Sequence, residues 1–136
     1  MSILEASLAI KDQILNDRHN LHRCPEIGFN LPQTAAYVQK RLTEMGIESQ
    51  LCGGPIDKQL RDNFVFAGFP DMEASTGVVA TIGKGEPCIL LRADMDALPM
   101  AETPGLVDFT SEVPGMAHMC GHDTHTAMLL GAAKLL

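Results

Sequence analysis

The sequence predicts an α/β fold in which helices and a sheet pack in layers. Three observations support this prediction: apolar residues recur at helical spacing near the N-terminus, a short continuous apolar run occupies residues 88–92, and a strongly apolar segment follows residue 123. The chain has 136 residues, of which 46% are hydrophobic, and this is enough for one ordinary domain with a core.

Two helices are predicted in the first third of the chain. Residues 2–22 carry isoleucine, leucine and alanine at helical spacing, and Pro25 closes this element. Pro32 lies in the first turn of a second helix, which runs to about Met45 and has Gly46 as its natural C-terminal cap.

Short strands, a loop and a last helix are predicted for the rest. The strands are expected at residues 47–51, 64–67, 77–82 and 88–92. The last of these is continuously apolar, which is typical of a strand covered on both faces. Residues 93–117 contain three Pro and two Gly and predict a long loop. The final helix starts near Asp123, a good N-cap, and its nearly all-round apolar character predicts burial.

Charge and cysteine content exclude several classes of protein. A net charge of −7 without a basic stripe argues against nucleic acid and against an anionic membrane surface as partners. No apolar run is long enough for a transmembrane helix, and the N-terminus lacks signal-peptide features. The four cysteines are scattered without paired spacing, so we expect a cytoplasmic protein with reduced thiols, in which Cys52 and Cys88 are buried.

Residues 118–125 carry the strongest functional signal, because five potential metal ligands fall within eight residues. These are His118, Cys120, His122, Asp123 and His125. Thiolate, imidazole and carboxylate bind Zn²⁺ and its neighbours in the first transition row. In an extended segment, a spacing of two puts His118, Cys120 and His122 on one face, facing one metal or two adjacent ones. The dipole of the following helix favours the Cys120 thiolate, and Asp123 either caps that helix or orients one imidazole. The alternative is a polar loop whose histidines are only hydrogen-bonded.

A second group of polar residues follows the apolar run directly. Asp94 and Asp96 come just past the predicted strand, where α/β proteins place their sites. Asp96 can orient a metal-bound imidazole and Asp94 can add negative charge; the alternative is a strand end with solvated acids. His19 and His22 lie three apart on the first helix, and for them we expect a surface or helix-end role.

Five stretches together resemble the co-catalytic metallo-amidohydrolases. This family includes N-acyl-amino-acid deacylases, hippurate hydrolases and auxin-conjugate (IAA-amino acid) hydrolases, which are relatives of the aminoacylase-type metallopeptidases. The matching stretches are Leu21–Phe29, Thr34–Tyr37, Gly77–Ile82, Leu90–Pro99 and His118–Ala133. Their order and spacing fit along nearly the whole chain, and the last two are highly specific.

The resemblance implies a layered catalytic domain of the di-metal aminopeptidase and carboxypeptidase type. Residues 1–136 are then the N-terminal portion of this domain, incomplete at the C-terminal side, and residues 53–75 are an insertion relative to shorter members. The last helix has no stop signal at Leu136, so the natural product is expected to be longer. The lid or dimerisation domain, the general-base Glu and the remaining ligands are expected outside this chain.

The resemblance also implies roles for single residues. Cys120 and His122 would be metal ligands, and Asp96 would be the catalytic Asp that supports the metal centre. Other side chains of the two motifs would line the site or support its ligands, namely Asp94, His118, Asp123 and His125. The cofactors would be two divalent ions, zinc or manganese, with cobalt or nickel as further options. They would activate a water that attacks the amide of an N-acyl amino acid or a small peptide.

One alternative function stays open at this point, a truncated, non-catalytic fragment that binds metal weakly or self-associates. Cys120 and His122 alone would bind weakly, because tight sites need three or four protein ligands. An exposed apolar last helix would favour self-association. The resemblance implies a small-molecule substrate and allows a homo-oligomer, and it does not separate a deacylase from a peptidase.

Overall fold

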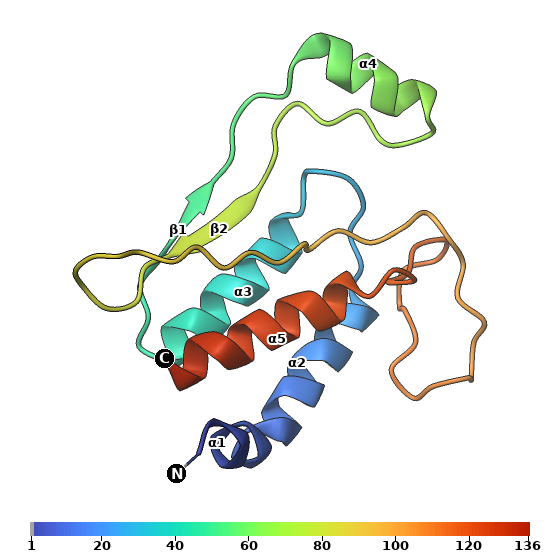
Figure 1. Cartoon of the computed structure of the whole chain (residues 1–136). Coiled ribbons are helices and arrows are strands. Elements are labelled where there is room, and N and C mark those ends of the chain that lie inside the picture. The colour runs from blue at the N-terminus through green and yellow to red at the C-terminus, as the bar shows by residue number, and fades with distance from the viewer. Residues whose placement is uncertain (1) are drawn as a thin grey trace.

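The computed structural model describes residues 2–136, which form five helices and two strands. These are α1 (Ile3–Ala9), α2 (Lys11–Arg23), α3 (Pro32–Glu44), β1 (Ser49–Cys52), α4 (Lys58–Phe66), β2 (Gly77–Ala80) and α5 (His122–Leu135). Helices α2, α3 and α5 lie together, the β1–β2 pair packs beside α3, and α4 stands away on a long arm (Figure 1). The predicted combination of helices with a sheet is therefore present.

The predicted N-terminal helix is divided in two. A capping box between Ser2 and Glu5 starts α1, and Ile10 separates α1 from α2 with φ −105° and ψ 9°. The Ser7 hydroxyl donates to the Ile3 carbonyl at 2.8 Å, a back-bond that bends helices. The second helical prediction is confirmed, because α3 begins at Pro32.

The strand predictions have mixed outcomes. Strands β1 and β2 confirm two of them and pair antiparallel, with Ser49 opposite Ala80. The strand predicted at residues 64–67 is wrong, because residues 64–66 belong to α4 and Ala67 is the C-cap of this helix. That helix has Asp57 as its N-cap: its carboxylate accepts from the backbone N–H groups of Gln59 and Leu60. An Asp ahead of the segment was the signal that favoured a helix.

The strand predicted at residues 88–92 is also absent. Within residues 2–136 this segment has no strand partner, and Ile89 and Leu90 are 80% and 85% exposed. A strand of this apolar type needs hydrogen-bonded neighbours on both sides and helices on both faces. The described residues supply neither, so the sheet has two strands. The long loop predicted at residues 93–117 is confirmed as irregular chain with isolated bridges.

Helix α5 lies against α2 and completes the small core. Leu130 of α5 packs with Val38 and Leu42 of α3. The predicted start of this helix is confirmed within one residue, but the N-cap is Gly121 rather than Asp123. Burial is limited to the face toward α2 and α3. The opposite face is open, with Met128 53% exposed, so the prediction of all-round burial is wrong.

A buried ion pair joins α2 to α3. Asp17, 1% exposed, accepts from Arg41 Nε at 2.6 Å and from the Tyr37 hydroxyl at 2.7 Å. Burial and the hydrogen bond to Asp17 raise the pKa of Tyr37 to about 12. Polar contacts thus join helix α2 to helix α3.

The arm that carries α4 covers most of the expected insertion, residues 53–75. An edge-to-face aromatic series holds its base, with the ring centroid of Phe64 4.8 Å from that of Phe29 and 5.4 Å from that of Phe69. All four cysteines are free and exposed, so the predicted burial of Cys52 and Cys88 is wrong. Within residues 2–136 no helix is long and apolar enough to cross a membrane.

Candidate metal centre

His122 opens helix α5 and has a fixed ring orientation. Gly121 takes φ +99°, a left-handed turn that glycine adopts without strain, and the helix begins immediately after it. The Nδ1 atom of His122 lies 2.9 Å from the Asp96 carbonyl oxygen and 3.0 Å from its carboxylate Oδ1. Two acceptors at Nδ1 place the proton there and leave Nε2 with a lone pair for a ligand.

Two further side chains lie close to this imidazole. The ligand atoms of Asp94, His122 and His125 are all within 4.8 Å of one another. His122 and His125 share a helix face because they are three residues apart, and Asp94 Oδ2 lies 3.9 Å from His122 Nε2. The Thr126 hydroxyl donates to the Asp94 carbonyl at 2.8 Å, so the helix also fixes the backbone of this acid.

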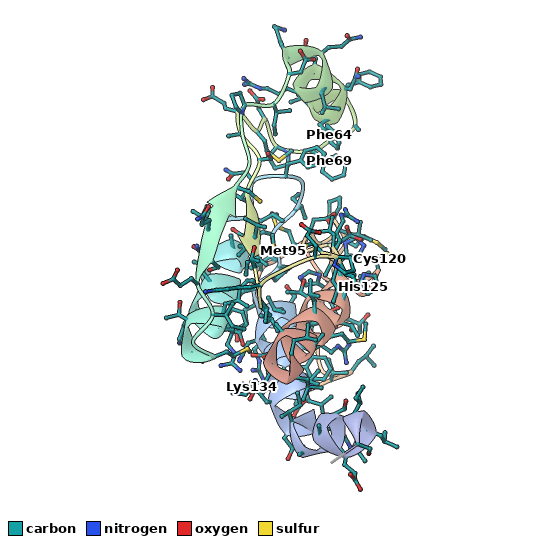
Figure 2. All side chains as sticks on the ribbon, turned by 60° about the vertical axis from the view of Figure 1, so that its left-hand side comes forward. Phe64, Phe69, Met95, Cys120, His125 and Lys134 are labelled. Atoms are coloured by element: carbon teal, nitrogen blue, oxygen red, sulfur yellow. The ribbon has the colours of Figure 1, made fainter. Side chains whose placement is uncertain are left out.

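The structure does not bring His118 and Cys120 into this cluster. The two residues were expected to share an extended face with His122, but the left-handed turn at Gly121 breaks the extended course. Cys120 is exposed and directly precedes Gly121, the N-cap of α5, at the end of this helix that lies away from Lys134 (Figure 2). The backbone turn at Gly121 therefore keeps the Cys120 side chain out of the cluster formed by Asp94, His122 and His125.

His118 is buried and lacks hydrogen bonds. It is 6% exposed, and neither ring nitrogen has a hydrogen-bond partner among the described residues. Burial lowers its pKa, so the ring is neutral near pH 7. The neighbouring Ala117 pairs with Leu98 through two backbone hydrogen bonds of 3.0 and 3.1 Å. This pairing joins the end of the 93–117 loop, just before His118, to the start of the same loop.

A polar network lies behind the cluster and contains residues that the sequence analysis missed. His22 is 4% exposed, so the surface alternative is wrong, while its place in the last turn of α2 agrees with the helix-end alternative. Its Nδ1 lies 2.8 Å from Asp123 Oδ2 and its Nε2 lies 3.1 Å from Glu102 Oε1. Asp123 was expected either to cap helix α5 or to orient an imidazole. It orients the imidazole of His22. Arg18 Nε also reaches Asp123 Oδ2, at 3.2 Å. The sequence contains one sign of this network: Arg18 and His22 are four residues apart, which puts both side chains on one helix face.

The two carboxylates of this network are ionised at neutral pH. Burial raises the pKa of Asp123, but hydrogen bonds from His22 and from the Thr124 backbone N–H outweigh it and hold the pKa below its usual value. The Ser111 backbone N–H, 2.7 Å away, lowers the pKa of Glu102, and His22 adds to this effect. Both contacts of His22 are therefore charge-assisted when its ring carries two N–H groups.

The donor set fits a divalent ion of the zinc type. Metal–nitrogen and metal–oxygen bonds of about 2.0–2.2 Å put neighbouring ligand atoms roughly 3–4 Å apart. The separations around His122 are close to this range. Asp96 supplies the acceptor that metal-binding histidines usually have behind them.

The sequence of this chain is similar to those of known metallopeptidases and amide hydrolases. Residues 90–136 match the model of peptidase family M20/M25/M40. An Arabidopsis thaliana protein, IAA-amino acid hydrolase ILR1-like 5, is 38% identical over 92% of this chain, which covers 24% of that protein. The Bacillus subtilis N-acetyl-L-cysteine deacetylase is 40% identical over 93% of the chain, which covers 26% of it.

The fold of this chain is also similar to that of a solved structure from the M20 family. The chain matches the crystal structure of the Bacillus subtilis YXEP protein, described as a dinuclear metal binding peptidase from the M20 family, with a TM-score of 0.71 and 37% sequence identity. The match covers 94% of this chain and 31% of the YXEP chain. The expected fold class is thereby confirmed, and the chain spans less than a third of the length of these relatives.

Proposed function

We propose that the chain is part of an enzyme of peptidase family M20/M25/M40, whose model matches residues 90–136, and that it supplies one side of a two-metal site that hydrolyses amide bonds. The observation that carries the proposal is the His122 imidazole, whose Nε2 faces Asp94 while Asp96 fixes its Nδ1. Such a preset imidazole is what a metal site requires and what a solvated loop histidine lacks.

Specific roles follow for the residues of the two motifs. His122 would hold a metal through Nε2, and Cys120 would hold one through its thiolate at the N-terminal end of α5. Asp94 and His125 would line the same site, and Asp96 would keep the His122 ring in place. A divalent ion bound there supplies a coordinated water of lowered pKa and polarises the carbonyl oxygen of the substrate.

The proposed substrates are N-acyl amino acids or small peptides. Two relatives are named for IAA-amino acids and for N-acetyl-L-cysteine, and both names describe an amide between an acyl group and an amino acid. The proposed ions are zinc or manganese, because imidazole, thiolate and carboxylate together suit these metals. We propose residues 1–136 as the N-terminal portion of the catalytic domain, with residues 53–75 as an insertion.

Removal of metal tests the proposal. Treating the natural gene product with a chelator is expected to abolish its hydrolysis of N-acetyl and hippuryl amino acids, and Mn²⁺ or Zn²⁺ is expected to restore it, because the attacking water depends on the ion. Rates would be measured together with metal content by mass spectrometry. A metal-free sample that keeps its full rate would contradict the proposal.

A second candidate function, a self-associating module, is favoured by the exposed apolar surface. Leu90 and Leu136 are 85% and 78% exposed. In the 136-residue chain, Leu90→Lys is expected to shift sedimentation toward monomer, because a charge in an apolar contact is costly. Thr81→Lys, on an exposed polar residue, is the matched control and should leave the distribution unchanged. A monodisperse monomer for the unmodified chain would rule this function out.

A further inference from the structure

His22 joins three segments that are far apart in the sequence. It lies at the end of α2, and its two ring nitrogens face Asp123 in α5 and Glu102 in the long loop. The two contacts span 101 and 80 residues of chain. The side chain is 5% exposed, so few other groups compete for these hydrogen bonds.

The first turn of α5 is held from two sides. On the side of α2, Asp123 accepts from His22 and from Arg18 at the same carboxylate oxygen. On the opposite side, His122 contacts Asp96 and the Thr126 hydroxyl donates to the Asp94 carbonyl. The fixed rotation of this turn therefore sets the distance between the imidazole and the two acids.

Glu102 extends the same restraint to the loop. Its second carboxylate oxygen accepts from the Ser111 backbone N–H at 2.7 Å, while its first faces His22 Nε2. The loop that contains Glu102, residues 93–117, also carries Asp94 and Asp96 near its start, and His118 follows its end. His22 thus contacts the helix that carries His122 and the loop that leads away from the two acids.

We propose that His22 is a positioning residue of the metal site: by bridging Asp123 and Glu102, it fixes the first turn of α5 against the loop and so sets the geometry of His122 toward Asp94. This inference rests on the proposed function. His22 itself does not contact the ion in this arrangement. Its loss displaces ligands without removing one, and supporting groups of this kind typically change metal affinity by about 10–100-fold.

Cobalt binding to the full 136-residue chain tests the proposal. Co²⁺ would be titrated into the wild type, His22→Phe and His22→Gln, and followed by its visible absorption bands, which report ligand geometry. His22→Phe is expected to weaken Co²⁺ binding about 10–100-fold and to change the bands. His22→Gln keeps one hydrogen bond and should lie between the two. It also keeps the test informative if His22→Phe does not fold.

His19→Phe is the matched control. It makes the same chemical change on the same helix, where His19 stacks on Phe109 with 3.9 Å between ring centroids. This variant should bind Co²⁺ as the wild type does. Urea unfolding of each variant separates stability from positioning. If the His22 variants lose stability but keep the affinity and the bands of the wild type, the role is structural only and the proposal is overturned.

A measurement without metal separates this proposal from the proposed function. Nitrogen-15 NMR of the histidine rings in the metal-free chain reports whether His122 keeps its proton on Nδ1. We expect a fixed Nδ1–H form in the wild type and in His19→Phe, and a mixture of tautomers in His22→Gln. If the wild type binds no Co²⁺, the metal function fails for this chain, while an unchanged His122 tautomer in His22→Gln overturns the positioning role alone.

Discussion

Replacing His122 by Ala in the natural gene product is expected to reduce metal-dependent amide hydrolysis by on the order of 1000-fold or more, as for residues that act as one catalytic unit. The substitution deletes the imidazole that Asp96 holds in place and leaves Asp94 with Arg92 as its remaining nitrogen partner. Metal content and kcat/KM for an N-acetyl amino acid would be measured on the same samples. Both should fall together.

Cysteine variants give this prediction a matched pair. Cys120→Ala removes the other proposed ligand and should produce a loss similar to that of His122→Ala. Cys88→Ala removes another exposed thiol, outside the two motifs, and should leave kcat/KM unchanged. If Cys120→Ala retained wild-type activity and metal content, the assignment of Cys120 as a ligand would be incorrect, while the His122 result would stand.

Replacing Asp17 by Ala is expected to lower the free energy of unfolding by about 3–5 kcal/mol, because it leaves Arg41 and the Tyr37 hydroxyl without their buried acceptor. Domains of this size are stable by roughly 5–15 kcal/mol, so the loss is a large share of the total. Urea unfolding followed by circular dichroism measures it. Asn16→Ala, at an exposed position of the same helix, is the control and should change stability by less than about 0.5 kcal/mol.

Tyr37 gives an optical check of the same network. It is the single tyrosine in a chain without tryptophan, so tyrosinate absorbance reports it alone. Its pKa is raised to about 12 in the folded protein, by burial and by Asp17. A raised pKa stabilises the fold fully below the unfolded value of about 10, and this contribution is lost as the pH rises toward 12. In Asp17→Ala the tyrosinate midpoint should fall, and an unchanged midpoint would show that Asp17 does not hold this proton.

The candidate site was predictable where its residues are neighbours in the sequence. His122 and His125 share a helix face because they are three apart, and Asp94 and Asp96 were singled out as one motif. The network behind them was not predictable. His22 meets Asp123 across 101 residues, and Glu102 sits in a loop without periodicity, so no local pattern connects them.

Local chain chemistry accounts for most of the secondary structure. Pro32 and Gly46 bound helix α3, and the β-branched residues Val78 and Val79 favour strand β2, because turns, caps and short strands depend on a few adjacent residues. The same reasoning failed for residues 88–92. A strand exists only where another strand donates and accepts its backbone hydrogen bonds, and an apolar run does not show whether that partner is present.

The sequence therefore indicated the resemblance to a family, the two motifs around Asp94 and His122, and the positions of α3, α5, β1 and β2, since these depend on residues close together along the chain. The tertiary structure alone decided that His22 is buried between two carboxylates, that Asp123 faces α2, and that the turn at Gly121 separates Cys120 from the cluster around His122. The physical reason is that burial, ion pairing and ligand separation depend on which distant segments meet, and helix packing fixes this only after the chain has folded.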